Sequence, residues 1–513
     1  MTLREKIFKT FLVTIREINE HGGPEEFFKK YPVGGMYYGE GNALRNEIGQ
    51  EVGTQMTYEK LLECKAHAPQ RLWVCADGAQ IRGQQLLNNG RSVMASPDPE
   101  KNAYEYGRIV GMQMNDKGID CVLGPAIDMC FDHTTAWGIS NDPVFTAKFY
   151  RQMIRGIRDQ GVCTTAKHFP GMGTHHVNMH LAPGHNVFDM ERWMETYGYT
   201  YQQVIDEGVD SVMNTHITLK ACDPDTHDGY LPIATYSEKI TTGLLKEKLG
   251  FAGPVVTDAL IMGGMATGDL VAETVQAFKA GADWLLWPPV EAAEAIENAI
   301  LSGEIPMSRL EDALARIERA ERFRLEALEQ KRYDTPDAAH ADAFVARMAA
   351  ESICLIRDEK DLVPFGDGVK SVLIINSTGE DESEACALVA EELNSRGIRT
   401  EIKRHIYDKE SLVVWQKEVE ALQRDFDRVL FLVQTQHELW NTALMTIWAS
   451  HLFDKRKKVI VNFGLPWFAV DYFPEDPTLI QANCGPEAYL LKALAQRLCG
   501  EAPFTGIPTL KGV

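Results

Sequence analysis

Apolar and polar positions alternate along the first two thirds of the chain between short strand-like runs and longer segments with helical spacing. The pattern predicts strands at Pro32–Tyr38, Leu72–Ala76, Cys121–Ile127, Val162–Ala166, Ser211–Thr215, Val255–Thr257 and Trp284–Trp287. It predicts helices over residues 1–20, 98–118, 143–160, 190–207 and 237–249, with further helices over 290–330. Strands that alternate with helices call for a parallel sheet with crossover helices. The pattern therefore favours a (β/α)8-type barrel, although it does not place an eighth strand.

A polar stretch separates this region from a second, smaller alternation. We predict a barrel over residues 1–335, a linker over 336–350 and a smaller α/β domain over 351–513. The second domain has predicted strands at Ser371–Ile375, Arg399–Ile402, Val429–Val433, Val459–Phe463 and Leu479–Ala482. Such a series favours an open, doubly wound sheet. Its sequence contains neither a GxGxxG nor a P-loop signature, so a nucleotide site there has no support.

Polar residues stand at the C-terminal ends of successive predicted barrel strands: Asp77, Asp128, Lys167, His168, His216 and Asp258. A single Asp after a strand most often caps the next helix. The carboxyl ends of barrel strands all meet at one rim, however, which is where catalytic groups lie in such folds. The repetition therefore predicts a polar small-molecule site organised around Asp258, whose apolar strand leads into a turn at Gly263 and Gly264.

The charge and the cysteines narrow the class of protein. With 52 Lys and Arg against 73 Asp and Glu, the net charge of −21 argues against nucleic-acid and anionic-membrane partners. The N-terminus lacks the apolar core of a signal peptide, and no apolar run is long enough to span a membrane. The ten cysteines form no C-x-x-C pair, which is typical of a reducing cytoplasm. We expect a cytoplasmic protein; its oligomeric state stays open.

A histidine-rich loop follows the fourth predicted strand. It reads KHFPGMGTHHVNMH over residues 167–180, and a metal site at His175, His176 and His180 is one interpretation. Loops concentrate histidine for many reasons, and no other cluster supplies ligands at a fixed spacing. We therefore predict neither a metal nor another cofactor.

KHFPGMG, followed downstream by VVTDALIMGGM, resembles glycoside hydrolase family 3, and most closely its β-N-acetylglucosaminidase (β-hexosaminidase) branch. The resemblance covers nearly the whole chain, including VGGMYYG, GIDCVLGPAID, VMNTH and, in the second domain, VNFGLP. It implies a (β/α)8-type TIM barrel followed by a smaller α/β sandwich domain. It also implies a small carbohydrate substrate and a retaining mechanism with a glycosyl-enzyme intermediate.

The resemblance also implies roles for individual residues. Asp258 matches the family nucleophile, which attacks the anomeric carbon. Lys167, His168 and His216 match positions that hydrogen-bond sugar hydroxyls. Asp77 and Arg82 match the family's D-x-x-x-x-R, in which a carboxylate acceptor and a fixed cationic donor grip the sugar.

This chain departs from the family where the acid/base belongs. The branch uses a loop His preceded by an Asp in an Asp-Ser-His pattern, and the aligned residues are Asn178, Met179 and His180. Asn can orient an imidazole but adds no charge that would stabilise its protonated form. Two further positions differ: the family's first loop His is Met172, and a sugar-contacting Arg aligns with Trp137. These changes alter one side of the sugar pocket.

Four hypotheses follow. The first is a retaining, exo-acting β-N-acetylhexosaminidase with Asp258 as nucleophile and His180 as acid/base. The second is a glycoside phosphorylase, because Asn178 would not repel phosphate as an Asp would. The third is a catalytically degenerate carbohydrate-binding protein. The fourth keeps a glycosidase but takes its acid/base from the second domain, where Glu438 follows a predicted strand.

Overall fold

The chain folds into two compact units. Unit 1 comprises Met1–Asn89, Ala103–Gly138 and Asp142–Pro336, and unit 2 comprises Gly90–Asn102, Ile139–Asn141 and Asp337–Val513. The structure is a computed structural model that describes residues 1–39, 56–77, 90–131, 138–174, 179–226, 229–265, 267–377, 383–404, 417–434, 450–485 and 487–512. Within these residues no helix has the length and apolar character needed to cross a membrane.

Unit 1 is a parallel eight-stranded barrel, as the sequence predicts. Its strand order is β10-β1-β2-β3-β4-β5-β7-β9. A parallel bridge between Val256 and Trp284 closes the sheet, and Thr257 N donates to Trp284 O at 3.0 Å. The strands are β1 Phe11–Val13, β2 Gly35–Tyr37, β3 Trp73–Ala76, β4 Cys121–Val122, β5 Cys163–Phe169, β7 Ser211–Asn214, β9 Val255–Thr257 and β10 Leu285–Leu286.

The eighth strand is β1, inside the segment predicted as one helix. The prediction of a helix over 1–20 is wrong, because α1 (Leu3–Phe8) and α2 (Ile15–Glu20) flank a buried strand. Thr14 begins α2 by accepting a hydrogen bond from Glu17 N at 3.0 Å. β1 pairs with β10 on one side and β2 on the other. This tertiary pairing outweighs the helical spacing of the local apolar residues.

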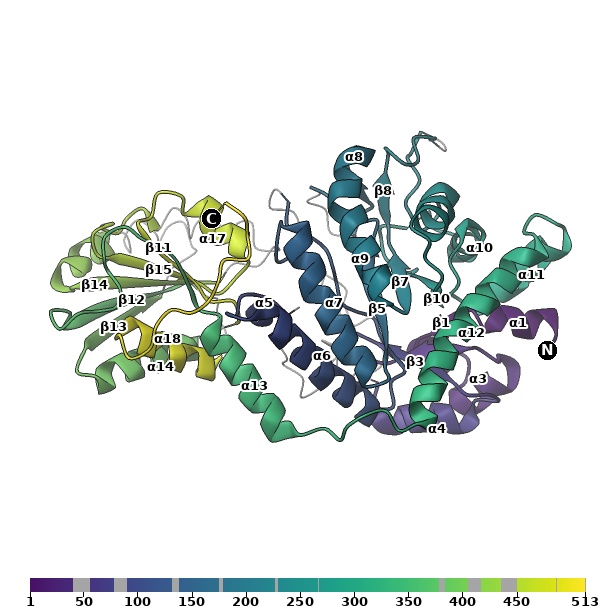
Figure 1. Ribbon diagram of the computed structural model, residues 1–513, viewed down its shortest axis with the longest axis horizontal. Helices are drawn as coiled ribbons and strands as arrows, with labels where there is room; N and C mark the ends of the chain where they lie inside the picture. The colour runs from purple at the N-terminus through teal and green to yellow at the C-terminus, as the bar shows by residue number, and fades with distance from the viewer. Residues whose placement is uncertain are drawn as a thin grey trace. The chain divides into compact units, whose positions relative to one another are not determined.

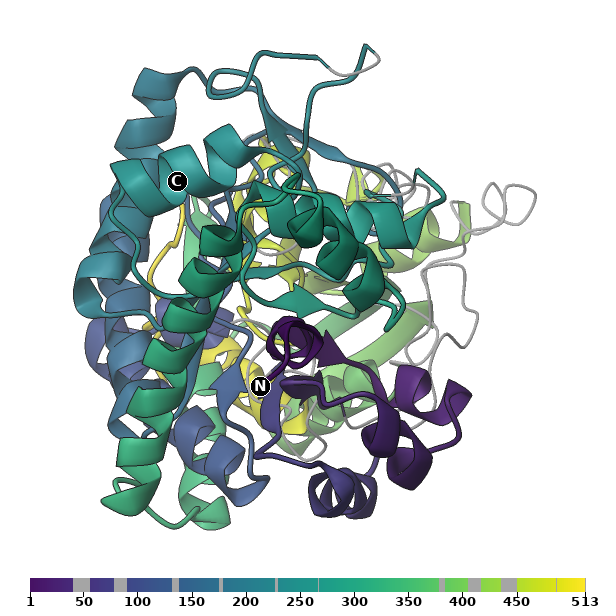
Figure 2. The ribbon, with the colours of Figure 1, turned by 90° about the vertical axis from the view of Figure 1, so that its right-hand side faces the viewer.

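Helices surround the barrel strands (Figure 1). α7 and α9 pack against each other along β5 and β7, and Figure 2 shows α1, in purple, beside α11 and α12. A separate two-stranded parallel sheet joins β6 (Gly184–Asn186) to β8 (Ile217–Leu219). The helical segments of unit 1 not yet given are α3 Pro24–Lys30, α4 Tyr58–His67, α6 Pro99–Asp116 (its first turn in unit 2), α7 Pro143–Asp159, α8 Met190–Trp193, η3 Met194–Gly198, α9 Tyr199–Glu207, η4 Lys239–Lys248, α10 Leu270–Ala280, α11 Ala292–Leu301 and α12 Met307–Glu329.

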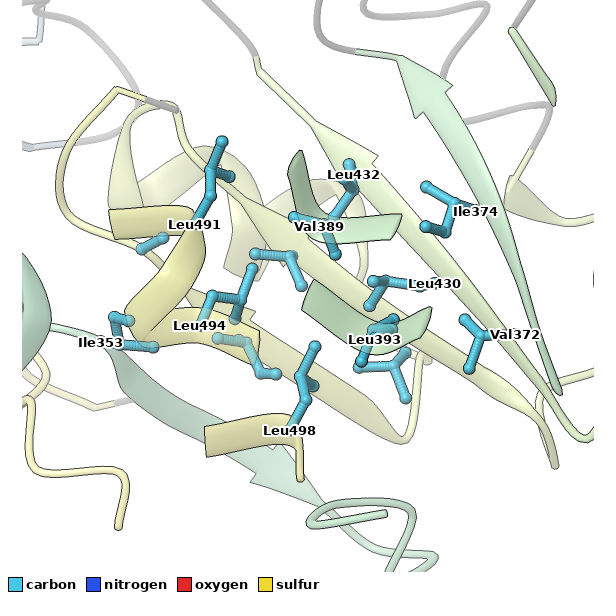
Figure 3. Close-up of a cluster of buried hydrophobic side chains, with 14 of the residues drawn as sticks. Ile353, Val372, Ile374, Val389, Leu393, Leu430, Leu432, Leu491, Leu494 and Leu498 are labelled. Carbon is cyan, nitrogen blue, oxygen red and sulfur yellow. The ribbon is translucent and has the colours of Figure 1, made fainter. Parts of the chain in front are cut away.

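Unit 2 contains a six-stranded sheet in the order β11-β16-β15-β14-β12-β13. Its five parallel strands follow the order of a doubly wound sheet, and β11, which the pattern did not predict, is antiparallel at one edge. Figure 3 shows leucines of α14 and α18 packed on β12 and β14. The elements are α5 Arg91–Met94, α13 Ala338–Glu351, β11 Cys354–Asp358, β12 Ser371–Ser377, α14 Ser383–Ser395, β13 Arg399–Arg404, η5 Gln423–Asp425, β14 Arg428–Val433, β15 Lys458–Asn462, α17 Pro466–Tyr472, β16 Thr478–Gln481 and α18 Ala488–Leu498.

A buried arginine fastens α12 to the N-terminal end of the barrel. Arg324 is 2% exposed, and its Nε donates to Asp120 Oδ1 at 3.0 Å. Its other nitrogens donate to Asn115 Oδ1 and to the carbonyl oxygens of Ile119 and Gly161. Asp120 Oδ2 also accepts from the backbone of β3. One side chain thus ties the last barrel helix to β3, β4 and β5.

Removing this buried cation should destabilise the fold. We expect Arg324→Met to lower the free energy of unfolding by about 3–5 kcal/mol, because Asp120 stays buried with a partner lost. The matched control is Arg322→Ala, which breaks an exposed pair with Glu318 and should cost no more than about 0.5 kcal/mol. Urea unfolding measures both values. A small loss for Arg324→Met, similar to that of the control, would contradict this assignment.

Candidate active site

Asp258 follows β9 at the C-terminal end of the barrel, and its carboxylate is held at both oxygens. The Thr215 hydroxyl donates to Oδ2 at 2.7 Å, and Ala259 N donates to Oδ1 at 2.8 Å. The backbone N–H of Asp258 donates to Asn214 O at 2.8 Å, so the residue continues the pairing of β7 with β9. The side chain is partly exposed. A fixed carboxylate is thus presented at the rim.

The surroundings of Asp258 favour its ionised form. Burial by itself would raise the pKa of Asp258, but the neighbouring His168 and Lys167 side chains and the Thr215 hydrogen bond together lower it below the ordinary 3.8. Opposite charges and hydrogen bonds to the charged form are the two effects that stabilise a carboxylate. Asp258 is therefore an anion at neutral pH.

Lys167 and Asp77 form an ion pair across the rim. Lys167 Nζ donates to Asp77 Oδ1 at 2.6 Å, and the Tyr37 hydroxyl donates to Oδ2 at 3.1 Å. Lys167 lies in β5, which runs past the predicted end at Ala166 as far as Phe169. Both oxygens of Asp77 are thereby oriented by side chains of β2 and β5. The pair places a cationic donor and an anionic acceptor side by side, an arrangement that can bind two adjacent hydroxyl groups.

Tyr37 and Trp287 also belong to this group, and the sequence reasoning missed them. Trp287 follows β10, and the ring centroids of the two residues lie 5.2 Å apart, edge to face. Trp287 has a left-handed backbone (φ 62), which is uncommon for a residue with a side chain and clusters at functional sites. The only feature of the sequence that could have pointed to Tyr37 and Trp287 is their position near the end of a predicted strand.

His168 is oriented by a buried acid. Its Nδ1 lies 2.7 Å from Asp128 Oδ2, and since a carboxylate accepts, Nδ1 carries the proton. Asp128 is 1% exposed, and its Oδ1 has no hydrogen-bond partner among the described residues. Burial, with the charge of Asp128 adding to it, raises the pKa of Tyr150 and Tyr201. Asp128 thus acts as a fixed negative charge behind the imidazole.

His216 is engaged by protein groups at both ring nitrogens. Nε2 lies 3.1 Å from Ala259 O, and Nδ1 lies 2.9 Å from Thr235 Oγ1. A carbonyl only accepts, so Nε2 carries the proton and Nδ1 accepts from the Thr235 hydroxyl. Burial lowers the pKa of His216, although the nearby charge of Asp258 acts to raise it. In this arrangement His216 is neutral and braces the backbone next to Asp258.

His180 is exposed and lies beside the turn that follows Asp258. Its backbone carbonyl accepts a hydrogen bond from Gly263 N at 2.7 Å. The first half of its loop is held by Gly171 and Gly173, both in left-handed conformations and both against other side chains. A Cβ on Gly171 would meet the Tyr197 ring at 2.2 Å, and one on Gly173 would meet Asn186 Oδ1 at 2.8 Å. This packing explains two of the motif's glycines.

The structure brings most of the predicted site residues to one rim. Asp77 meets Lys167, Asp128 meets His168, and His216 and His180 flank the segment after Asp258. Other predicted residues lie outside the described ranges: Arg82, Trp137, His175, His176, Asn178 and Glu438. Within the described part of the chain, the one trio spaced for a metal ion is Glu17, His21 and Glu291, which includes none of the rim residues.

The state of His216 predicts how stability depends on pH. The unfolded chain takes up a proton near the ordinary His pKa of 6.5, and the folded chain does so only at lower pH. Below about pH 6.5 the unfolded state binds more protons, so the free energy of unfolding should fall as the pH falls. We expect His216→Asn to show a shallower fall than wild type between roughly pH 7 and 5. His340→Asn, at an exposed position, is the control; an unchanged slope in His216→Asn would refute the assignment.

Comparisons with known proteins agree with this architecture. A β-N-acetylglucosaminidase/β-glucosidase of Cellulomonas fimi is 25% identical over 461 residues, which cover 84% of this chain and 81% of that protein. A β-N-acetylglucosaminidase of glycoside hydrolase family 3 from Paenibacillus sp. str. FPU-7 has a TM-score of 0.75 at 21% identity, and the match covers 99% of both chains.

A further solved structure, the β-glucoside phosphorylase BglX bound to 2FGlc, has a TM-score of 0.78 at 21% identity and covers 100% of this chain and 94% of its own. At these identities the structural likenesses show the fold. The model of the glycosyl hydrolase family 3 N-terminal domain matches residues 2–320, more than half of the chain. With a rim carboxylate on the closed barrel and a second α/β unit, the chain belongs to glycosyl hydrolase family 3 and is a glycosidase.

Proposed function

We propose that the protein is a retaining, exo-acting β-N-acetylhexosaminidase with Asp258 as its nucleophile. The observation that carries this proposal is the environment of the Asp258 carboxylate, which is fixed by Thr215 and the backbone of Ala259. The lowered pKa of Asp258 keeps it ionised, as a nucleophile must be. Its place at the C-terminal end of β9 puts it where barrel enzymes hold their reacting groups.

In the first step an Asp258 oxygen attacks the anomeric carbon of the β-glycoside. The bond from that carbon to the glycosidic oxygen breaks, and its electron pair stays on the leaving oxygen. The imidazolium of His180 donates a proton to this oxygen, which departs as an alcohol. The products are a glycosyl ester on Asp258 and a neutral His180.

In the second step water attacks the anomeric carbon from the face that the aglycone has left. His180 takes the proton of the attacking water, and the bond between the anomeric carbon and Asp258 breaks with its electron pair returning to the carboxylate. Two inversions at one carbon retain the β configuration. Asp258 is again ionised and His180 again protonated.

The sugar is gripped by charged and polar side chains of neighbouring strands. Asp77 accepts from one hydroxyl and Lys167 donates to the next, while Asp128 fixes the ring of His168 for a third contact. Arg82, which completes the D-x-x-x-x-R pattern that begins at Asp77, would add a further donor to the sugar, and His216 holds the Asp258 segment through its Ala259 contact. The name of the Cellulomonas fimi relative supports an N-acetylglucosaminide as substrate. All ten cysteines are free thiols, which supports a cytoplasmic location.

Replacing the nucleophile tests the mechanism. We expect Asp258→Gly to lower kcat/KM for an aryl β-N-acetylglucosaminide by roughly 10⁴-fold or more, since no covalent intermediate can form. Added azide should restore turnover and give the α-glycosyl azide, because one inversion replaces two. Asp269→Gly is the control: this Asp caps α10 and should leave turnover within about threefold of wild type. Full activity in Asp258→Gly would exclude Asp258 as the nucleophile.

A second candidate function is phosphorolysis, and the uncharged Asn178 favours it. An Asp at that position would repel a phosphate dianion in the second step, whereas Asn does not. Incubating the enzyme with substrate, with and without phosphate, and identifying the products by NMR decides between acceptors. The proposed hydrolase yields free sugar in both conditions. A glycosyl phosphate in the phosphate sample would identify the phosphorylase instead.

A further inference from the structure

The turn after Asp258 receives the loop that carries His180. Gly263 N donates to His180 O at 2.7 Å, and Gly264 N donates to Met179 O at 3.0 Å. Two consecutive backbone N–H groups of the turn thus donate to two consecutive carbonyl oxygens of the loop, so the loop and the turn run alongside each other over two residues. Hydrogen bonds of this length are well formed. The loop is therefore seated on the segment that begins at the nucleophile.

Neither Gly263 nor Gly264 has room for a side chain, because the loop backbone passes close to both Cα atoms. A Cβ on Gly263 would lie 2.7 Å from the carbonyl oxygens of His180 and Leu181. A Cβ on Gly264 would lie 2.6 Å from Met179 O and 3.0 Å from the Cβ of His216. Neither glycine has a left-handed φ, so backbone conformation alone does not require glycine here. Any side chain at either position would push the loop off the turn.

We propose that Gly263 and Gly264 are positioning residues that seat the acid/base loop against the nucleophile strand. The inference rests on the proposed roles of Asp258 and His180. Both groups then take their positions from one short segment, residues 258–264, the first by covalent attachment and the second by two backbone hydrogen bonds. General acid catalysis requires hydrogen-bond reach of the glycosidic oxygen, and a displacement of about 1 Å can cost on the order of 100-fold in rate.

The backbone contacts matter because His180 has an exposed side chain. Because burial does not hold an exposed imidazole in place, the position of its backbone helps to set where the ring can reach. Thr215 also reaches this part of the loop, since its hydroxyl lies 3.5 Å from Met179 Sδ and also donates to Asp258. Loop, turn and nucleophile thus share contacts at a single place.

Gly263→Ala tests this contact, since the nearest neighbours of its added methyl group are the carbonyls of His180 and Leu181. We expect kcat/KM for an alkyl β-N-acetylglucosaminide to fall about 100-fold, because the departing alkoxide needs a proton. For a 2,4-dinitrophenyl glycoside, whose leaving group needs none, we expect a fall of less than about threefold. The ratio of the two rates does not depend on the folded fraction. Gly243→Ala, at a helical position whose Cβ would meet no atom closer than 3.9 Å, should leave both rates unchanged.

Azide supplies a second readout. Once the dinitrophenyl substrate has formed the glycosyl-enzyme, azide attacks without a general base, so it should accelerate turnover of Gly263→Ala and give the β-glycosyl azide. Wild type and Gly243→Ala should show no such acceleration. Gly264→Ala should behave in the same direction as Gly263→Ala, with an added effect through its contact with His216.

His180→Ala, measured in parallel, separates the two claims. Suppose that His180→Ala lowers kcat/KM far more for the alkyl glycoside than for the dinitrophenyl glycoside, whereas Gly263→Ala lowers both equally. The positioning role of Gly263 is then wrong, and the acid/base assignment of His180 stands. If His180→Ala slows both substrates alike, the acid/base assignment fails and the seat fails with it. Leaving-group discrimination in both variants supports the proposal.

Discussion

The carboxylate of Asp258 is the constraint on which the rest of the site depends. A charged group at the tip of a buried apolar strand carries a desolvation cost, which here acts to raise the pKa of Asp258. The protein offsets it with a hydroxyl from β7's end, a backbone N–H and cations from β5. Parallel strands of a closed barrel are what bring these groups together, because their carboxyl ends share one rim.

Lys167 and His168, the two basic side chains that β5 brings to the rim, each have an acidic partner. Asp77 pairs with Lys167, and Asp128 pairs with His168, so neither of these two basic side chains is fully committed to Asp258. This arrangement limits how strongly the Asp258 carboxylate is stabilised, which matters for its proposed role as nucleophile because an overly stabilised carboxylate attacks poorly and leaves readily. His216 differs from both, since burial keeps it neutral and its nitrogens hold backbone and hydroxyl groups. It stiffens the strand end without adding charge.

The sequence pattern predicted those features that depend on local order. A polar residue directly after an apolar run, repeated from strand to strand, located Asp258, Asp77 and His168 without a structure. It did not reveal β1, since three apolar residues between two capped helices carry no period of their own.

Features that depend on long-range contacts were also out of reach. Tyr37 and Trp287 could not be assigned to the site until the barrel placed Tyr37 on Asp77 and Trp287 on Tyr37. Gly263 and Gly264 were visible as a turn, but their role is set by Met179 and His180, more than eighty residues earlier.

Trapping the glycosyl-enzyme tests the account's central claim most directly. The native enzyme would be incubated with a fluorinated N-acetylglucosaminyl donor that forms the intermediate faster than water releases it, then digested and analysed by mass spectrometry. The account predicts one adduct, on the peptide that contains Asp258. This adduct should not form when an excess of unlabelled substrate analogue occupies the site. An adduct on another carboxylate, or none in an enzyme that still turns over natural substrate, would contradict it.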